Sequence, residues 1–389
     1  MKLGVLRERA AGERRVSLAP DAVKRLIGDG HTVTVQSGAG TGALFDDADY
    51  LSVGADIAED LSSILTTSDV VFGIRGLGMD DASDLQNVNA GTVLIAQVQP
   101  LSDDPAYYHR LTDCGVTLFN MGSIPRISRS QSMDVLSSMS TVSGYRSVLL
   151  AAERLPKFFP LFMTAAGTIP PAKVLVLGAG VAGLQAIATA RRLGAVVQAF
   201  DTRPIVREQV ESLGASFLTV DVQTAQTQDG YARALADDLH RRELEALAKP
   251  VAEADVVITT ALIPGQRAPI LITTEMVRSM RPGSVIVDLA AEASGNCELT
   301  EPGETVVRHG VTIAAPFNVP SQLPIPASQL YARNVTTFFQ HCVSQGLAVS
   351  PSGRTELDLS DEIVHRTCLI LNGEIVNESL QRRLFAERS

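Results

Sequence analysis

The stretch KVLVLGAGVAGLQAIATARRLGAVVQAFD, residues 173–201, decides the fold. It begins as a continuous apolar strand and passes directly into a good helix-forming segment. Between them, Gly178, Gly180 and Gly183 form the pattern G-x-G-x-x-G. The first glycine permits a tight turn, the second lets the backbone approach a pyrophosphate, and the third lets helix and strand pack closely. The stretch therefore predicts a dinucleotide-binding βαβ unit, against the alternative of a glycine-rich turn without a ligand.

The acid at the end of the next strand indicates which dinucleotide is bound. Asp201 follows Gly183 by eighteen residues (201 − 183). An acidic side chain at this place accepts hydrogen bonds from the adenosine ribose and repels a 2′-phosphate, which favours NAD(H) over NADP(H). The helix N-terminus supplies N–H groups and a partial positive charge for the pyrophosphate. Arg203, two residues further on, keeps the choice of cofactor open.

Apolar strands alternate with short helices on both sides of this stretch, as in LGVLRE, HTVTVQSG, AGTVLIAQV, DVVITT and GSVIVDLA. The pattern predicts an α/β protein of two doubly wound, parallel-sheet (Rossmann-like) domains joined by long helices, with the fingerprint in the second. One helix is expected at about 133–155 and another at roughly 330–345, after a proline-rich segment. The predicted domains are residues 1–135 with 319–389, and residues 136–318.

Composition excludes several classes of function. The net charge is −10, and no block of Lys or Arg is available to neutralise phosphates, so no nucleic-acid partner is expected. No two of the six histidines have metal-ligand spacing, and the four cysteines form no C-x-x-C pair, so we expect no metal and reduced thiols. Prolines and glycines interrupt the apolar stretch 158–190, which is therefore expected not to cross a membrane.

A polar loop at residues 126–137 lies where the two domains are predicted to join. It contains Arg126, Arg129, Gln131, Asp134 and Ser137, side chains that together can bind a carboxamide and a ribose. Clefts at domain junctions commonly hold ligands, which favours a binding role. A solvated linker would also be polar, so that alternative stays open.

The sequence offers no well-placed general base. A dehydrogenase that acts on an alcohol or amine must move a proton as well as a hydride, and it commonly uses His or Lys for this. All six histidines lie in predicted helices, at a strand start or in surface-like contexts. Hydride transfer between two nicotinamides releases no substrate proton, so the protein need only orient the rings. This pattern suits such a reaction.

Longer blocks carry a specific resemblance. They are MGSIPRISRSQSMDVLSSMSTVSGYRSV, MTAAGTIPPAKVLVLGAGVAGLQAIATARRLGA, FDTRPIVREQVESLGASFL, TTALIPG and GSVIVDLAAEASGNCE. The chain, from its start to about residue 374, resembles the NAD(H)-binding component (domain I of the alpha subunit) of proton-translocating NAD(P) transhydrogenase, within the alanine dehydrogenase/transhydrogenase superfamily.

The resemblance implies an activity and an assembly. The activity is direct, Si-specific hydride transfer from NADH on this chain to NADP⁺ on the NADP(H)-binding domain of a partner, the beta subunit. Separate membrane chains would couple it to proton translocation. The chain is then expected to be a homodimer, held peripherally on the cytoplasmic side of the bacterial inner membrane. Because the sequence stops near Ser389 without a membrane segment, it resembles the first chain of alpha subunits that are split in two.

The resemblance also implies roles for individual residues. Four residues of the polar loop would act at the nicotinamide: Arg126, Gln131, Asp134 and Ser137. The nucleotide would be bound by the glycine turn, the ribose acid and its neighbours, a mobile-loop tyrosine and the TALIPG segment: Gly178, Gly180, Val181, Ala182, Gly183, Asp201, Thr202, Arg203, Tyr231, Thr260, Ala261 and Leu262. The chain departs from the family pattern at Gln266 and Gln322.

Two other functions share the fingerprint. An alanine dehydrogenase-like enzyme would carry a catalytic His where this chain has Gln97, and a substrate-binding Lys within VVFGIRG, which holds Gly73 and Arg75 instead. Its remaining acid and arginine would be Glu292 and Arg15. A non-enzymatic NAD sensor is the third possibility, but it would have no use for the polar loop 126–137.

Overall fold

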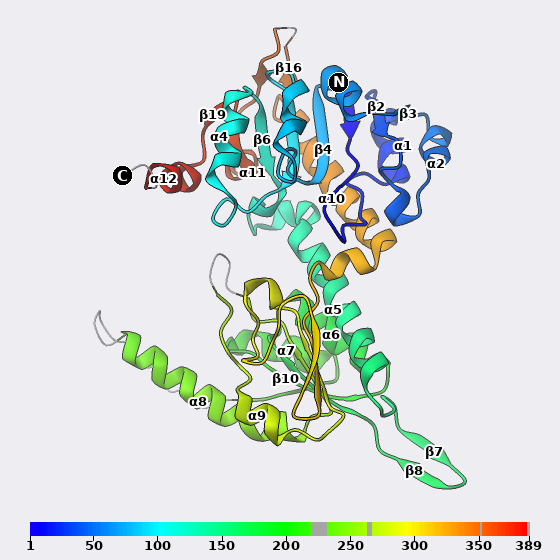
Figure 1. Ribbon diagram of the computed structural model, residues 1–389, viewed down its shortest axis with the longest axis vertical. Helices are drawn as coiled ribbons and strands as arrows, with labels where there is room; N and C mark the ends of the chain where they lie inside the picture. The colour runs from blue at the N-terminus through cyan, green and yellow to red at the C-terminus, as the bar shows by residue number, and fades with distance from the viewer. Residues whose placement is uncertain (220–231, 263–266, 351, 387–389) are drawn as a thin grey trace. The chain divides into compact units, whose positions relative to one another are not determined.

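The chain forms two compact units in a computed structural model, which describes residues 1–219, 232–262, 267–350 and 352–386 (Figure 1). Unit 1 is made of Met1–Met139 and Pro320–Ser389, and unit 2 is the intervening Ser140–Val319. The predicted domains end at residues 135 and 318, whereas the units end at 139 and 319. Unit 1 is therefore discontinuous in sequence.

An eight-stranded sheet in the order β19-β18-β6-β5-β4-β1-β2-β3 forms the centre of unit 1. Neighbouring strands from β3 to β6 pair in parallel, and β18 and β19 add an antiparallel edge. The strands are β1 (Lys2–Val5), β2 (Thr32–Gln36), β3 (Asp56–Ala58), β4 (Val70–Arg75), β5 (Val93–Gln97), β6 (Thr117–Asn120), β18 (Cys368–Leu371) and β19 (Glu374–Ile375). The strand order reverses between β1 and β4, which makes this the topological switch point of the sheet.

The helices of unit 1 include α10 (Pro324–Ser344), which is buried along much of its length. We expected this helix to begin at about residue 330, after the prolines, and that boundary is wrong. Pro324 occupies the first helical position, where its missing N–H has no intrahelical partner to lose. The other helices are α1 (Pro20–Gly28), α2 (Asp47–Ser52), α3 (Leu61–Thr67), α4 (Pro105–Asp113), α11 (Glu362–Thr367) and α12 (Glu378–Ala386), and β16 (Ala348–Val349) pairs with β17 (Thr355–Glu356).

Unit 2 contains a seven-stranded sheet in the order β11-β10-β9-β12-β13-β15-β14, parallel except at β14. Its strands are β9 (Lys173–Leu177), β10 (Val196–Phe200), β11 (Ser216–Phe217), β12 (Val256–Thr259), β13 (Val285–Asp288), β14 (Thr305–Arg308) and β15 (Val311–Ala314). Its helices are α6 (Val181–Arg192), α7 (Arg207–Ser212), α8 (Ala232–Glu253) and α9 (Thr274–Ser279), and α5 (Val135–Arg154) crosses the unit boundary. Two mainly parallel sheets confirm the predicted fold class.

Strand β9 is buried on both faces, which explains its unbroken apolar sequence. Val174 and Val176 belong to the core on one face of the sheet, and Leu175 and Leu177 belong to the core on the other. A parallel strand covered by helices on both sides needs apolar residues at every position. Its end therefore delivers Gly178 to the carboxyl edge of the sheet.

An exposed hairpin of unit 2, β7 (Phe162–Thr164) with β8 (Gly167–Ile169), was not predicted. All six strand residues are exposed, so the sequence shows no alternation of buried and exposed side chains. The hairpin extends away from the body of its unit (Figure 1) and carries Phe162, Met163 and Ile169, which are 40%, 76% and 40% exposed.

Further findings on the described residues concern membranes, metals and thiols. None of the helices described is long and apolar enough to cross a bilayer. No group of metal-ligating side chains large enough to hold an ion occurs among the same residues. All four cysteines are free thiols, and three of them are buried.

Candidate dinucleotide-binding site

The glycine turn connects β9 to α6 in unit 2. Gly178 has a φ of +99°, in the region that favours glycine, and a Cβ there would lie 2.5 Å from Thr260 Oγ1. A Cβ on Gly183 would lie 1.9 Å from the carbonyl oxygen of Gly178, so helix and turn touch directly. A Cβ on Gly180 would meet no atom within 4 Å. The turn is thus closed on the protein side and open at Gly180.

The N-terminus of α6 fits the pyrophosphate of a dinucleotide. Gly180 is its N-cap, with no side chain to cap the helix, and the helix starts with Val181 and Ala182. The first N–H groups of a helix lack intrahelical partners, and the helix dipole places partial positive charge there. With Gly180 open, a phosphate can approach these groups.

Asp201 follows β10 and is linked to the glycine turn. Its carboxylate accepts the N–H of Ala179 at 2.7 Å, and it also accepts the backbone N–H of Arg203 at 2.9 Å. The guanidinium of Arg203 forms a two-pronged ion pair with the same carboxylate, with both contacts at 3.0 Å. Burial alone would raise the pKa of Asp201, but the hydrogen bonds from Arg203 and Ala179 hold the pKa below its ordinary value. Thr202 beside it is exposed.

The segment after β12 forms another wall of the same turn. Thr260 Oγ1 donates to the carbonyl of Gly178 at 3.1 Å. Asn296 exchanges two hydrogen bonds with the backbone of Ala261, at 3.1 Å from the N–H and 2.9 Å to the carbonyl. Leu262 is 55% exposed. The structure therefore brings Thr260 and Ala261 to the glycine turn.

Sequence reasoning missed the residues that support this wall. Asp288, at the end of β13, is fully buried and accepts the hydroxyls of Thr259 and Thr300 at 2.8 and 2.6 Å. It also accepts the N–H groups of Ala290, Asn296 and Cys297 at 3.0, 2.8 and 3.2 Å. Its only signal in the sequence is an acid at the end of an apolar strand, GSVIVDLA.

The polar loop 126–137 belongs to unit 1 and contains a short 3-10 helix, η4 (Ser128–Met133). Asp134 accepts the N–H of Ser137 at 3.0 Å and its hydroxyl at 2.6 Å, which connects these two residues at the start of α5. Arg129 forms an ion pair of 2.6 Å with Asp361, which anchors the loop to α11.

The remaining predicted residues have varied surroundings. Arg126 and Gln131 are exposed. Gln322 ends the 3-10 helix η7 (Val319–Gln322) and is half-buried. Tyr231 and Gln266 lie outside the described residues.

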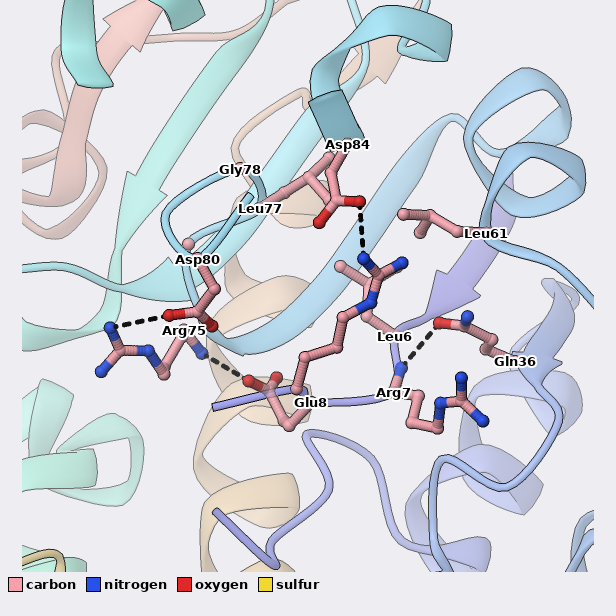
Figure 2. Close-up of a pocket in the computed structure, with 12 residues that line it drawn as sticks. Leu6, Arg7, Glu8, Gln36, Leu61, Arg75, Leu77, Gly78, Asp80 and Asp84 are labelled. Atoms are coloured by element: carbon pink, nitrogen blue, oxygen red, sulfur yellow. Dashed lines mark hydrogen bonds and ion pairs between the residues drawn. The ribbon is translucent and has the colours of Figure 1, made fainter. Parts of the chain in front are cut away.

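A small cavity of about 40 Å³ lies at the switch point of unit 1, beside the ends of β1 and β4 (Figure 2). The Glu8 carboxylate accepts the N–H groups of Ile74 and Arg75 at 2.6 and 3.3 Å. Arg9 pairs with Asp84 at 2.9 Å. Burial raises the pKa of Glu8 from 4.5 to about 7, and the two backbone hydrogen bonds oppose this shift.

Features expected of an amino-acid dehydrogenase are altered in the same region. A Cβ on Gly73 would lie 2.7 Å from the carbonyl oxygen of Arg75, so a lysine does not fit there without a backbone shift. Arg15 is buried in a two-pronged ion pair with Glu13, at 2.8 and 2.6 Å. Its guanidinium is thus already engaged by a carboxylate of the chain. These contacts disfavour a carboxylate-substrate pocket of that type.

The raised pKa of Glu8 leads to a pH-dependent prediction. A carboxyl whose pKa is raised by folding stabilises the folded state below its unfolded pKa and loses that contribution as the pH rises through the folded value. We expect Glu8→Gln, which cannot ionise, to gain stability relative to the unchanged chain between pH 4.5 and about 7. Melting temperatures measured across this range check it, with exposed Glu59→Gln as the control. A difference that does not vary with pH would contradict it.

Known proteins match the chain along almost its whole length. Models of the families "Alanine dehydrogenase/PNT, N-terminal domain" and "Alanine dehydrogenase/PNT, C-terminal domain" match residues 4–143 and 147–378. The first of the two chains that make up NAD(P) transhydrogenase subunit alpha of Rhodospirillum rubrum is 46% identical, over 98% of this chain and 99% of that protein. Alanine dehydrogenase 2 of Staphylococcus aureus is 31% identical, over 86% and 85%.

A solved structure agrees with these matches. The transhydrogenase structure from Sinorhizobium meliloti has a TM-score of 0.85 and 40% identity, covering 97% of this chain and all of that one. Fold and glycine turn are those of nicotinamide-dependent oxidoreductases. The chain belongs to the alanine dehydrogenase/PNT family, and it is similar to transhydrogenase alpha subunits along its length.

Proposed function

We propose that this chain is the NAD(H)-binding subunit of a proton-translocating transhydrogenase. The observation that carries the proposal is the 46% identity to the first chain of a transhydrogenase alpha subunit, over 98% of the present chain. NADH would give a hydride to NADP⁺ held on the NADP(H)-binding domain of the beta subunit, forming NAD⁺ and NADPH. Separate membrane chains would couple this transfer to proton translocation.

The residues around the glycine turn would hold NAD(H). The α6 N-terminus, approached over Gly180, would bind the pyrophosphate, and Asp201 would accept the ribose hydroxyls. Thr260, Ala261 and Leu262 would border the nucleotide, and the loop residues Arg126, Gln131, Asp134 and Ser137 would orient the nicotinamide. The bound nucleotide supplies the hydride, so the chain's own groups need only bind, orient and exclude water.

The assembly is part of the same proposal. We expect a homodimer, attached peripherally through its partner subunits to the cytoplasmic side of the bacterial inner membrane. The exposed apolar hairpin β7–β8 supports self-association, because a contiguous apolar surface on a protein commonly marks an interface. The occupant we assign to it is a second copy of this chain.

A reconstituted assay tests the function. The purified chain is mixed with a transhydrogenase NADP(H)-binding domain, and reduction of an acetylpyridine analogue of NAD⁺ by NADH is followed in the presence of NADP(H). We expect turnover that requires both proteins. No turnover there, together with oxidation of alanine by NAD⁺, would assign the chain to the amino-acid dehydrogenases instead.

Asp134→Asn should separate hydride transfer from binding. The asparagine keeps one acceptor for Ser137 but removes the charge from the loop. We expect hydride transfer to slow by about tenfold or more, because fixed charges near a reacting centre contribute most in the transition state. NADH affinity should change by less than about twofold on the same argument. Stopped-flow kinetics and calorimetric titration measure the two quantities, with exposed Ser128→Ala as control, and equal losses in both would reduce Asp134 to a binding residue.

A further inference from the structure

The carboxylate that should receive the ribose is already saturated. Asp201 Oδ2 accepts from Ala179 N at 2.7 Å and from Arg203 Nη2 at 3.0 Å. Oδ1 accepts from the backbone N and the Nε of Arg203, at 2.9 and 3.0 Å. A carboxylate has about four lone-pair positions, so no position remains for a further donor.

The two side-chain contacts of Arg203 are the ones that can be exchanged. The Asp201 side chain is 8% exposed, whereas that of Arg203 is 58% exposed. Backbone donors cannot leave without rearranging the turn, but an exposed guanidinium can move into water. Two ribose hydroxyls would therefore take the places of Nε and Nη2, and NAD(H) would bind only as the guanidinium leaves.

A dinucleotide with a 2′-phosphate makes the opposite demand. The phosphate would face the Asp201 carboxylate, and the two negative charges repel each other. If Arg203 stays in place, it neutralises the carboxylate and keeps three of its five N–H donors for the phosphate. The same guanidinium thus opposes one nucleotide and supports the other.

We propose that Arg203 determines nucleotide specificity in this site by competing with the ribose of NAD(H) for Asp201 and by binding the 2′-phosphate of NADP(H). The site then takes NADP(H) as a weaker second ligand. This inference rests on the proposed function, since it assumes that the glycine turn and Asp201 hold the adenosine half of a nicotinamide dinucleotide.

Arg203→Ala tests the inference, because it should shift the two affinities in opposite directions. Isothermal titration of the full chain with NADH should give a Kd lower by about two- to fivefold, as expected for loss of an exposed ion pair. Titration with NADPH should give a Kd higher by roughly tenfold or more, since charge-assisted hydrogen bonds are lost. The fragments 5′-AMP and 2′,5′-ADP should repeat these shifts, which would locate them at the ribose. Arg192→Ala, an equal charge change on the exposed end of α6, should leave both affinities within about twofold.

Other outcomes separate failure of the inference from failure of the function. Parallel weakening of NADH and NADPH would mean that Arg203 contacts a part that both share, and unchanged affinities would mean that it contacts neither. Either result overturns the inference while leaving the transhydrogenase assay active. If the unchanged chain binds no dinucleotide and supports no transhydrogenation, the proposed function fails with it.

Discussion

Asp288→Ala should lower the free energy of unfolding of unit 2 by about 3–5 kcal/mol, since the buried carboxylate accepts several donors that would lose their partner. These donors are two hydroxyls and three backbone N–H groups, all within 3.2 Å. Side-chain donors can turn away, but backbone donors in the buried segment after β13 cannot. Scanning calorimetry of the full chain would record the loss as a lower melting temperature of unit 2.

The consequence of the Asp288 change should reach the nucleotide site. Asn296 receives its position from Asp288 and in turn holds Ala261, so NADH binding should weaken even below the melting temperature. Glu304→Ala, which removes an exposed carboxylate of the same unit, is the control and should change neither property. Asp288→Asn should fall between them, because one acceptor oxygen survives. A stability loss no larger than that of the control would contradict the role given to Asp288.

Substitutions at Gly183 and Gly180 should separate folding from binding. At Gly183 the new Cβ would lie 1.9 Å from a backbone carbonyl, so α6 must move away from the turn. We expect Gly183→Ala to destabilise unit 2 by about 3 kcal/mol, near the upper end for overpacking, and to abolish NADH binding. At Gly180 the Cβ would enter open space, so Gly180→Ala should fold normally but bind NADH at least about tenfold more weakly, because it fills the approach of the pyrophosphate.

Each glycine variant serves as the control for the other. Both replacements add one methyl group to the same turn, so composition cannot explain a difference between them. Alanine is favoured over glycine inside a helix by about 1 kcal/mol, so a stabilised Gly183→Ala would show that the contact with Gly178 is absent. Tight NADH binding by Gly180→Ala would show that the nucleotide does not pass over this turn. Thermal unfolding and NADH titration of both variants supply the measurements.

Local patterns predicted the fold well where short-range sequence determines structure. The run from β9 to Asp201 could be interpreted because burial on both faces requires apolar residues at each strand position and the turn requires glycine. The start of α10 was predicted too late, because proline usually ends helices but is also favoured in their first turn. The hairpin β7–β8 gave no signal, since neither of its faces is buried.

The candidate site was less predictable because its contacts join distant parts of the chain. Asn296 reaches Ala261 across 35 residues, and Asp288 reaches Thr259 across 29. No local spacing encodes such pairs. The bidentate contact of Arg203 with Asp201 is local, but it depends on which rotamer a long side chain adopts, and a sequence pattern does not contain that choice.

The insertion of unit 2 into unit 1 sets an order of events during synthesis. Unit 2 is complete once residue 319 has been made, whereas unit 1 still lacks α10, whose Tyr331, Phe338 and Phe339 are fully buried in the finished structure. It also lacks β18, the strand that pairs with β6. A ribosome-bound chain can therefore complete its nucleotide-binding half first, while the earliest residues to emerge wait for the last ones. Premature termination near the C-terminus would spare unit 2 and leave unit 1 without part of its core.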